Sequence, residues 1–165
     1  MTSEESKTIE RIIKSLNTYC LGNITDSRKM NMRIGSFILC SCFIDQMAQI
    51  IYFEKNKKPK YTKNFESFVD KYFDKKYDSS LLYDALRCRL VHNYSVKGKY
   101  WLADTDDYAH MDIINGRTYI NIDKFIDDIK KVFIKFQDDL RNNAVATKKA
   151  IDHESVYPIL TEGTI

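Results

Sequence analysis

Glycine and proline are scarce in this chain of 165 residues, which contains 5 Gly and 2 Pro. Folds built from many short strands need these residues in their tight turns, so a β-sandwich or a β-barrel is disfavoured. Hydrophobic residues make up 44% of the chain and charged residues 30%, which is enough apolar material for one core and too much for a disordered chain. We expect a mainly α domain over residues 1–143 and a C-terminal tail or packing arm over 144–165.

An excess of charge of one sign is also lacking, because 26 Lys and Arg are balanced by 23 Asp and Glu, for a net charge of +3. Nucleic-acid binding by the chain as a whole is therefore disfavoured, and any such binding must come from a local patch. Five lysines lie within nine positions around Pro59, namely Lys55, Lys57, Lys58, Lys60 and Lys63. These lysines indicate either a solvated loop, which is the first interpretation, or a patch that contacts phosphate.

The four cysteines indicate neither a disulfide framework nor a metal site. Cys20, Cys40, Cys42 and Cys88 each lie within or beside an apolar run, as reduced core or interface cysteines do. Cys40 and Cys42 are one residue apart, but a zinc site needs four converging ligands, and neither a His nor a second Cys pair lies at that spacing. We expect no metal and no cofactor.

Signals for secretion or membrane insertion are missing as well. The sequence opens with polar and acidic residues and lacks the basic region, apolar stretch and cleavage site of a signal peptide. The longest uncharged stretch, from Ile34 to Ile44, has about half the length that a membrane span requires. We expect a cytoplasmic protein with no membrane partner.

Helical periodicity dominates the chain as far as residue 93. Thr2 and Glu5 form a candidate capping box for a first helix over about 3–20, and the residues after it indicate a loop over 21–30. Further helices are expected over 31–55, over a segment that ends near Asp74, over 80–93, and from Asp123, as N-cap, to about Asn142.

The run over 31–55 is apolar around most of its circumference, as expected for the central helix of a bundle. Asp45, Gln46 and Gln49 interrupt it. A carboxylate in such a helix needs a partner, because burial of an unpaired charge is costly. Arg87, or a symmetry-related group across a dimer, is the expected partner, although Arg87 could instead pair with its neighbour Asp84.

The period changes from helical to alternating after Gly98. Asn115-Gly116, between two alternating segments, is typical of a β-hairpin closed by a type I′ turn. We expect strands near 99–103, 109–114 and 117–122, which form a small meander before the last long helix. His110 is then an exposed strand residue and His153 a tail residue, and neither is assigned a role.

The end of the expected helix over 80–93 holds the densest cluster of chemically active side chains: Arg87, Arg89, His92, Asn93 and Tyr94. An arginine offers a permanent, forked charge to a phosphate, and a histidine exchanges a proton near neutral pH. Together they suit phosphodiester cleavage without a metal, in which an RNA 2′-hydroxyl attacks its own 3′-phosphate.

The stretch from Arg87 to His92 resembles the R-x4-6-H motif of HEPN domains, and with Asn93-Tyr94 it is similar to the R-x4-H-x-Y form of HEPN toxins in HEPN/nucleotidyltransferase toxin-antitoxin systems. The resemblance implies an up-and-down helical bundle and a homodimer that brings two copies of the motif to one cleft. It also implies metal-independent endoribonuclease activity, which many members have and others lack. Arg87 would stabilise the scissile phosphate, His92 would handle the proton, and Tyr94 would be adenylylated by a partner nucleotidyltransferase antitoxin.

Helix geometry qualifies this assignment. Residues five apart on a regular α-helix lie about 140° apart around its axis, so Arg87 and His92 do not converge unless the helix ends or the arginine swings round. Arg89, three residues before His92, shares its face and is a substitute or a helper. Asn93 is a further auxiliary or substrate-binding residue.

Three functions follow from this cluster. The first is a homodimeric endoribonuclease of stress or antiviral defence that a partner restrains. The second is a non-catalytic HEPN-like dimer that binds a nucleotide, RNA or a protein, which Cys88 favours, because active members often carry a polar residue at that position. The third is a structural bundle in which Arg87 and His92 belong to a buried ion-pair network, so that replacing either would lower the stability substantially.

Overall fold

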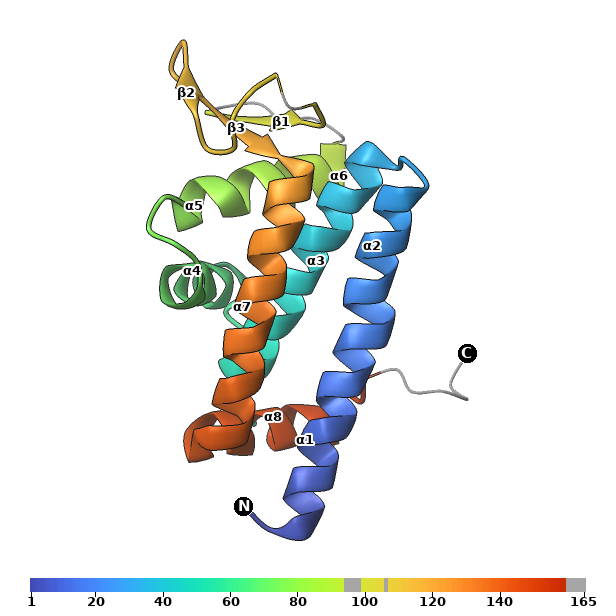
Figure 1. The fold of residues 1–165 in the computed structure, drawn as a ribbon. Helices are drawn as coiled ribbons and strands as arrows, with labels where there is room; N and C mark the ends of the chain where they lie inside the picture. Colours follow the sequence, from blue (N-terminus) through green and yellow to red (C-terminus); the bar gives the residue numbers. More distant parts are fainter. Residues whose placement is uncertain (94–98, 106, 160–165) are drawn as a thin grey trace.

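The chain folds into a helical bundle with a small sheet at one end, in a computed structural model that describes residues 1–93, 99–105 and 107–159 (Figure 1). The expected mainly α fold, with a small sheet before the last long helices, is confirmed. Three long helical elements lie side by side, while α8 (Ala144–Val156) crosses one end of the bundle and the sheet covers the other end (Figure 1).

The first helical element is longer than the sequence predicts. It consists of α1 (Ser3–Ser15), a π-helical turn η1 (Leu16–Leu21) and α2 (Gly22–Lys29) in direct succession. The expected capping box of Thr2 and Glu5 is present, but the expected loop over 21–30 is wrong. Ile24 is fully buried, and its burial outweighs the weak helix propensity of the glycine and asparagine before it.

The turn after this element is short and falls at Asn31. Its φ of 57° is the left-handed conformation that commonly ends a helix. The Ser27 hydroxyl, just before the turn, lies 2.9 Å from the hydroxyl of Ser36, just after it. This buried hydrogen bond joins the two helices across the turn.

Helix α3 (Arg33–Ile51) is the centre of the core and contacts α2, α4, α7 and α8. It packs against α7 (Ile122–Asn142) through the aromatic pairs Phe37–Phe125 and Phe43–Phe133, with ring centroids 6.2 Å and 5.2 Å apart. Each buried phenylalanine contributes about 1.5–3 kcal/mol relative to an exposed one. By length and composition α3 is also long and apolar enough to cross a membrane, but 56% of that window is buried inside the bundle. Packing in the core accounts for its apolar sequence.

The remaining helices cover α3. Helix α4 (Tyr61–Tyr72) is followed by a helical stretch made of α5 (Ser79–Leu82), a second π-helical segment η2 (Tyr83–Leu90) and α6 (Val91–Asn93). Helix α7 begins after Asn121, whose side chain accepts hydrogen bonds from two backbone N–H groups of the first turn. The expected N-cap, Asp123, is therefore wrong, because Asp123 lies inside the helix and pairs with Arg28 at 2.7 Å.

Residues 144–156 form α8, which packs against α1, α3 and α7. His153, expected as a tail residue, is 5% exposed. Glu154 is also buried and pairs with Arg11 of α1, with 3.0 Å between Oε1 and Nη2. The weak helical signal of this segment is therefore sufficient because neighbouring helices cover its inner face.

The sheet contains β1 (Tyr100–Ala103), β2 (Ile113–Ile114) and β3 (Arg117–Asn121). Strands β2 and β3 pair antiparallel around Asn115 and Gly116, with φ values of 52° and 73°. Positive φ at both central residues is what a type I′ turn requires. The expected Asn-Gly hairpin is confirmed.

The expected meander is wrong, because the strand order is β1-β3-β2 and β1 pairs parallel to β3. The segment near 109–112 does not continue β2 as a strand. Met111 has a φ of 70°, which interrupts extended backbone, and the side chain of His110 is 8% exposed rather than on the outside of a strand.

Replacement of glycine by alanine is expected to change the free energy of unfolding in opposite directions at Gly116 and at Gly22. Gly116→Ala is expected to lower the free energy of unfolding by about 1–2 kcal/mol, because an L-residue is strained at a φ of 73°. Gly22→Ala is expected to raise it by about 0.5–1 kcal/mol, because Gly22 is helical and its added methyl would meet only Asn17 O, at 3.6 Å. Urea denaturation of both variants measures these changes, and a loss of stability in Gly22→Ala would contradict the helical assignment of residues 21–30.

Candidate functional site

The predicted motif lies on the helical stretch that starts at Ser79. The side chain of Asp78 caps this stretch by accepting a hydrogen bond from Leu81 N at 2.9 Å. Its middle part, η2, is π-helical, so its hydrogen bonds join residues five apart instead of four. The expected separation of Arg87 and His92 by about 140° assumes a regular α-helix, and this assumption fails in the segment that contains Arg87.

Arg87 is anchored from one side. Its Nε donates to Asp45 Oδ2 at 2.9 Å, with side-chain exposures of 29% for Arg87 and 13% for Asp45. The predicted pairing of the buried carboxylate with Arg87 is thus confirmed. Burial is the largest influence and disfavours the charged guanidinium, but the hydrogen bond to Asp45 and the negative charge of that carboxylate together outweigh it and raise the pKa of Arg87. In the described part of the chain the two Nη groups make no hydrogen bond.

Asp45 also belongs to a longer chain of hydrogen bonds. Its other oxygen, Oδ1, accepts from Gln49 Nε2 at 3.1 Å, and Gln49 Oε1 accepts from Asn64 Nδ2 at 3.0 Å. Two of the three polar residues that interrupt the apolar pattern of α3, Asp45 and Gln49, are therefore hydrogen-bonded to each other and connect Arg87 to the start of α4.

Arg89 is engaged elsewhere. Its Nε donates to Asp84 Oδ2 at 2.6 Å, in a pair whose side chains are 41% and 48% exposed. His92 is exposed on α6, and among the described residues no hydrogen bond joins it to Arg87 or Arg89. Tyr94 and the side chain of Asn93, both predicted site residues, lie outside the described residues.

A second polar cluster was missed by sequence reasoning. Asn121 N–H donates to His110 Nδ1 at 3.2 Å, which leaves Nε2 to donate to the Tyr77 hydroxyl at 2.7 Å. Tyr77 in turn donates to Asp128 Oδ2 at 3.0 Å. No local sequence pattern predicts this hydrogen-bonded relay, because Tyr77 lies 33 positions from His110 and 51 positions from Asp128.

The relay fixes the charge states of its members. Burial, together with Lys76, lowers the pKa of His110 and keeps the imidazole neutral. Burial disfavours the Asp128 carboxylate, but hydrogen bonds from Lys76, Lys131 and Tyr77 outweigh it and lower the pKa of Asp128 to about 2. This cluster ties the residues before β2 to α7, which is a structural role.

A cavity of about 320 Å³ is the second feature that the sequence did not predict. It lies between the end of α3, the lysine-rich loop, the start of α4 and the end of α8. Gln49 and Asn64 of the hydrogen-bond chain line it, together with Lys57, Lys58 and Lys60. The lysine-rich loop is thus the rim of a cavity.

Groups that bind metals are dispersed. Within the described residues no three His, Cys, Asp or Glu side chains lie close enough together to hold a metal ion. The four cysteines are free thiols, and burial raises the pKa of Cys40 strongly. A buried thiol with a raised pKa is a packing group and a poor nucleophile.

No protein-family model, curated protein or solved structure matches the chain. The assignment to the HEPN superfamily therefore stays a prediction from residues 87–94 of the sequence.

Removal of Asp45 is expected to destabilise the protein more than removal of Asp84, although each change deprives one arginine of its partner. Asp45→Ala leaves a half-buried guanidinium and Gln49 without their acceptor and is expected to cost about 1–3 kcal/mol. The Asp84–Arg89 pair is exposed, so Asp84→Ala is expected to cost less than about 1 kcal/mol. Urea denaturation compares them, and equal small losses would show that Asp45 is not a structural anchor.

Stability is expected to fall as the pH decreases below 6.5, the ordinary pKa of histidine, because burial lowers the pKa of both His110 and His153. In this range the unfolded state binds protons that the folded state resists, so the free energy of unfolding rises with pH. Asp128 contributes to the pH dependence of stability only at lower pH. Its pKa is lowered from 3.8 to about 2, so its contribution is lost as the pH falls through that range.

Urea denaturation between about pH 7.5 and about pH 5 measures this dependence. His110→Gln is expected to flatten it in part, and His110→Gln/His153→Gln more strongly. An unchanged slope in the double variant would contradict the assignment of neutral, buried imidazoles.

Proposed function

We propose that this protein is a metal-independent endoribonuclease of HEPN type that works as a homodimer. The observation that carries the proposal is the geometry of Arg87: Asp45 holds its Nε, while the Nη groups and the exposed His92 remain available one helical turn away. An oriented guanidinium and a group that exchanges protons on the same helical stretch are the minimum that RNA cleavage through a 2′,3′-cyclic phosphate requires.

The reaction needs one proton removed and one proton donated. A base takes the proton from the 2′-hydroxyl, whose oxygen attacks the adjacent phosphorus, and the 5′-oxygen leaves with a proton from an acid. Two His92 side chains, one from each protomer, supply base and acid in this proposal. Arg87 stabilises the additional negative charge on the phosphorane through its Nη groups.

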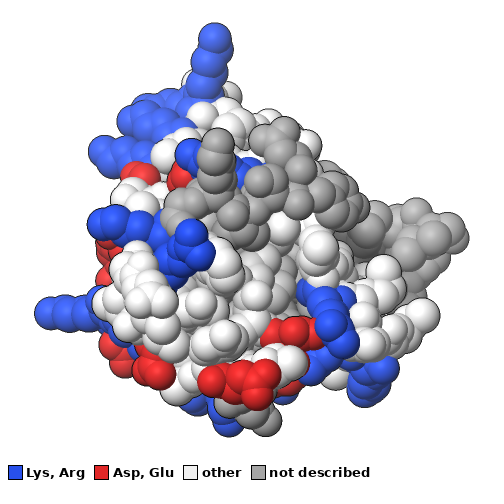
Figure 2. All heavy atoms as spheres, turned by 90° about the horizontal axis from the view of Figure 1, so that it is seen from above, with Lys and Arg blue, Asp and Glu red and all other residues white. Residues whose placement is uncertain are grey.

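The end of the molecule that carries α6 has the surface properties of an interface. Four exposed apolar side chains lie on the α2–α3 turn and on β1: Met30, Met32, Ile34 and Trp101. Arg33 at this turn pairs with Asp104 after β1, with 2.6 Å between Nε and Oδ2, so turn and sheet are adjacent. In Figure 2 the described part of this end shows many uncharged side chains, with Lys and Arg as well as Asp and Glu side chains along the border. The apolar side chains on this face suit contact with a second copy of the chain.

The finer parts of the proposal follow the sequence motif. A toxin or defence role, a cytoplasmic location, and restraint by a nucleotidyltransferase that adenylylates Tyr94 belong to it, with Arg89 and Asn93 as auxiliary groups. The second candidate function is a non-catalytic HEPN-like dimer that binds a nucleotide, RNA or a protein. It is favoured by the ion pair with Asp45, which partly neutralises Arg87.

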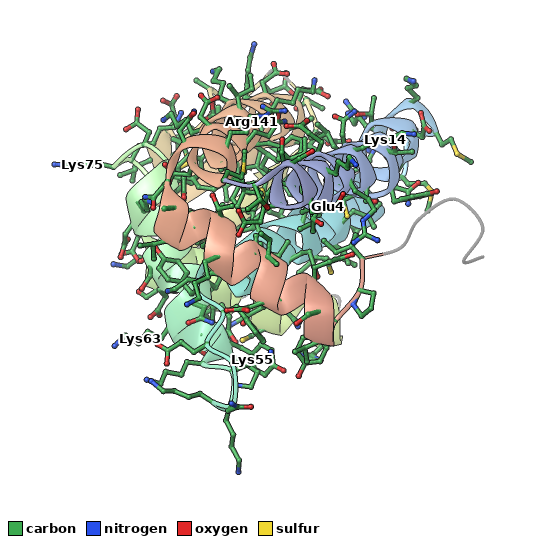
Figure 3. The ribbon with its side chains drawn as sticks, turned by 90° about the horizontal axis from the view of Figure 1, so that it is seen from below. Glu4, Lys14, Lys55, Lys63, Lys75 and Arg141 are labelled. Atoms are coloured by element: carbon green, nitrogen blue, oxygen red, sulfur yellow. The ribbon has the colours of Figure 1, made fainter. Side chains whose placement is uncertain are left out.

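Cleavage of a mixed RNA pool in EDTA tests the proposal. The wild type is expected to cut and to leave 2′,3′-cyclic phosphate ends, and Arg87→Ala and His92→Ala are each expected to lose at least about 100-fold of the rate. Arg141→Ala is the matched control, because Arg141 forms an exposed pair with Glu10 on a different face and is expected to keep full activity (Figure 3). Circular dichroism checks that each variant is folded.

Two results would overturn the proposal of ribonuclease activity. One is the absence of cutting by the folded wild-type dimer freed of any partner, and the other is equal cutting by all variants. The first result, with RNA still bound, would leave the binding dimer as the function.

A further inference from the structure

The cavity beside the lysine-rich loop combines three kinds of surface. One wall is aromatic: the His153 ring lies 5.3 Å from Phe53 and 5.6 Å from Tyr157, measured between centroids. The Gln49 and Asn64 amides line another part, and Lys57, Lys58 and Lys60 line a third. Its volume of about 320 Å³ is within the range of small-molecule sites.

His153 supplies an independent sign that a polar partner belongs here. It is 5% exposed, it lines the cavity, and its Nδ1 has no hydrogen-bond partner among the described residues. Burial lowers the pKa of this imidazole, so the ring is a neutral donor or acceptor. Buried polar atoms are nearly always satisfied. The Nδ1 nitrogen itself is fully buried, so a ligand in the cavity completes its bonding only after the His153 ring shifts.

The charge at the rim is positive. Glu54 is the one carboxylate that lines the cavity within the described residues, and Lys57 pairs with it. The hydrogen bond from Lys57 lowers the pKa of Glu54, and the charges of Lys60 and Lys149 lower it further. Lys58 and Lys60 have no acidic partner in the described part of the chain, so the rim offers two uncompensated ammonium groups to an anion.

We propose that this cavity binds one nucleoside monophosphate. The planes of Phe53, His153 and Tyr157 are inclined to one another by 51° to 90°, so the base stacks on one of these rings and meets the others edge to face. The Gln49 and Asn64 amides read the polar edge of the base with the N–H and oxygen positions that their own hydrogen bonds leave open, and His153 Nδ1 joins them after its ring shifts. The phosphate lies at Lys58 and Lys60, where it replaces counterions.

A lone phosphate or an aliphatic anion would use only one of the three surfaces. An inorganic phosphate leaves the aromatic rings without a partner, and a fatty acid makes no hydrogen bond to the Gln49 and Asn64 amides. A nucleotide uses all three at once. The site is independent of the ribonuclease proposal, because neither Arg87 nor His92 lines it.

Isothermal titration of the full chain with AMP, GMP, CMP and UMP tests this inference, with the corresponding nucleosides and inorganic phosphate as comparisons. We expect at least one monophosphate to bind with a Kd below about 1 mM and to bind at least tenfold more tightly than its nucleoside and than phosphate. The double variant Lys58→Ala/Lys60→Ala is expected to lose at least tenfold in affinity.

Lys14→Ala/Lys75→Ala is the matched control, because it removes the same charge from two lysines that lie away from the lysine-rich loop and α8 (Figure 3). We expect its affinity to equal that of the wild type. His153→Phe keeps an aromatic ring in the wall and removes the nitrogen, and it is expected to lose at least threefold in affinity while the protein stays folded by circular dichroism.

Three outcomes would overturn the site: no monophosphate bound by the folded wild type, equal weakening in the two lysine double variants, or binding of an RNA oligonucleotide without any monophosphate. The titrations are also made with His92→Ala, which keeps the cavity intact. Loss of RNA cleavage with retained nucleotide binding would count against the ribonuclease alone, and the reverse pattern would count against the cavity alone.

Discussion

Asp45 carries a carboxylate on the helix at the centre of the core. Because this carboxylate is largely buried, neighbouring side chains must donate hydrogen bonds to it. Arg87 comes to it from η2, and Gln49 comes from the next turn of α3. An unpaired charge at this place would be costly. The ion pair therefore fixes the position of the helical stretch that carries Arg87 along α3. Arg87 therefore has a fixed position at the surface of the bundle instead of the freedom of an ordinary surface arginine.

The parts of the fold that the sequence predicted depend on local signals. The capping box at Thr2, the Asn-Gly turn at 115–116 and the apolar pattern of α3 each specify a structure within a few residues. The pairing of Arg87 with Asp45 was one of two alternatives that the sequence left open, because a carboxylate in an apolar helix needs a partner, and the structure shows this one.

The parts that the sequence did not predict depend on contacts between distant segments. Ile24 keeps residues 21–29 helical because the core buries it, whereas its neighbours in sequence favour a loop. His110 leaves the strand because Tyr77 and Asn121 bind it. The cavity near Lys58 exists only where α3, α4 and α8 meet, so its residues carry no pattern of their own.

The two π-helical segments affect which deletions the helices tolerate. A π-turn is a stretch of helix with one residue more than the α-helix needs for the same number of turns. Loss of one residue within Leu16–Leu21 or Tyr83–Leu90 would return that stretch to α geometry and leave the helices on either side in their present orientation. Loss of one residue from the middle of α3 or α7 would instead rotate everything after it by about 100°. The two loosely wound segments are therefore expected to tolerate a deletion of one residue better than the long α-helices do, although neither is a loop.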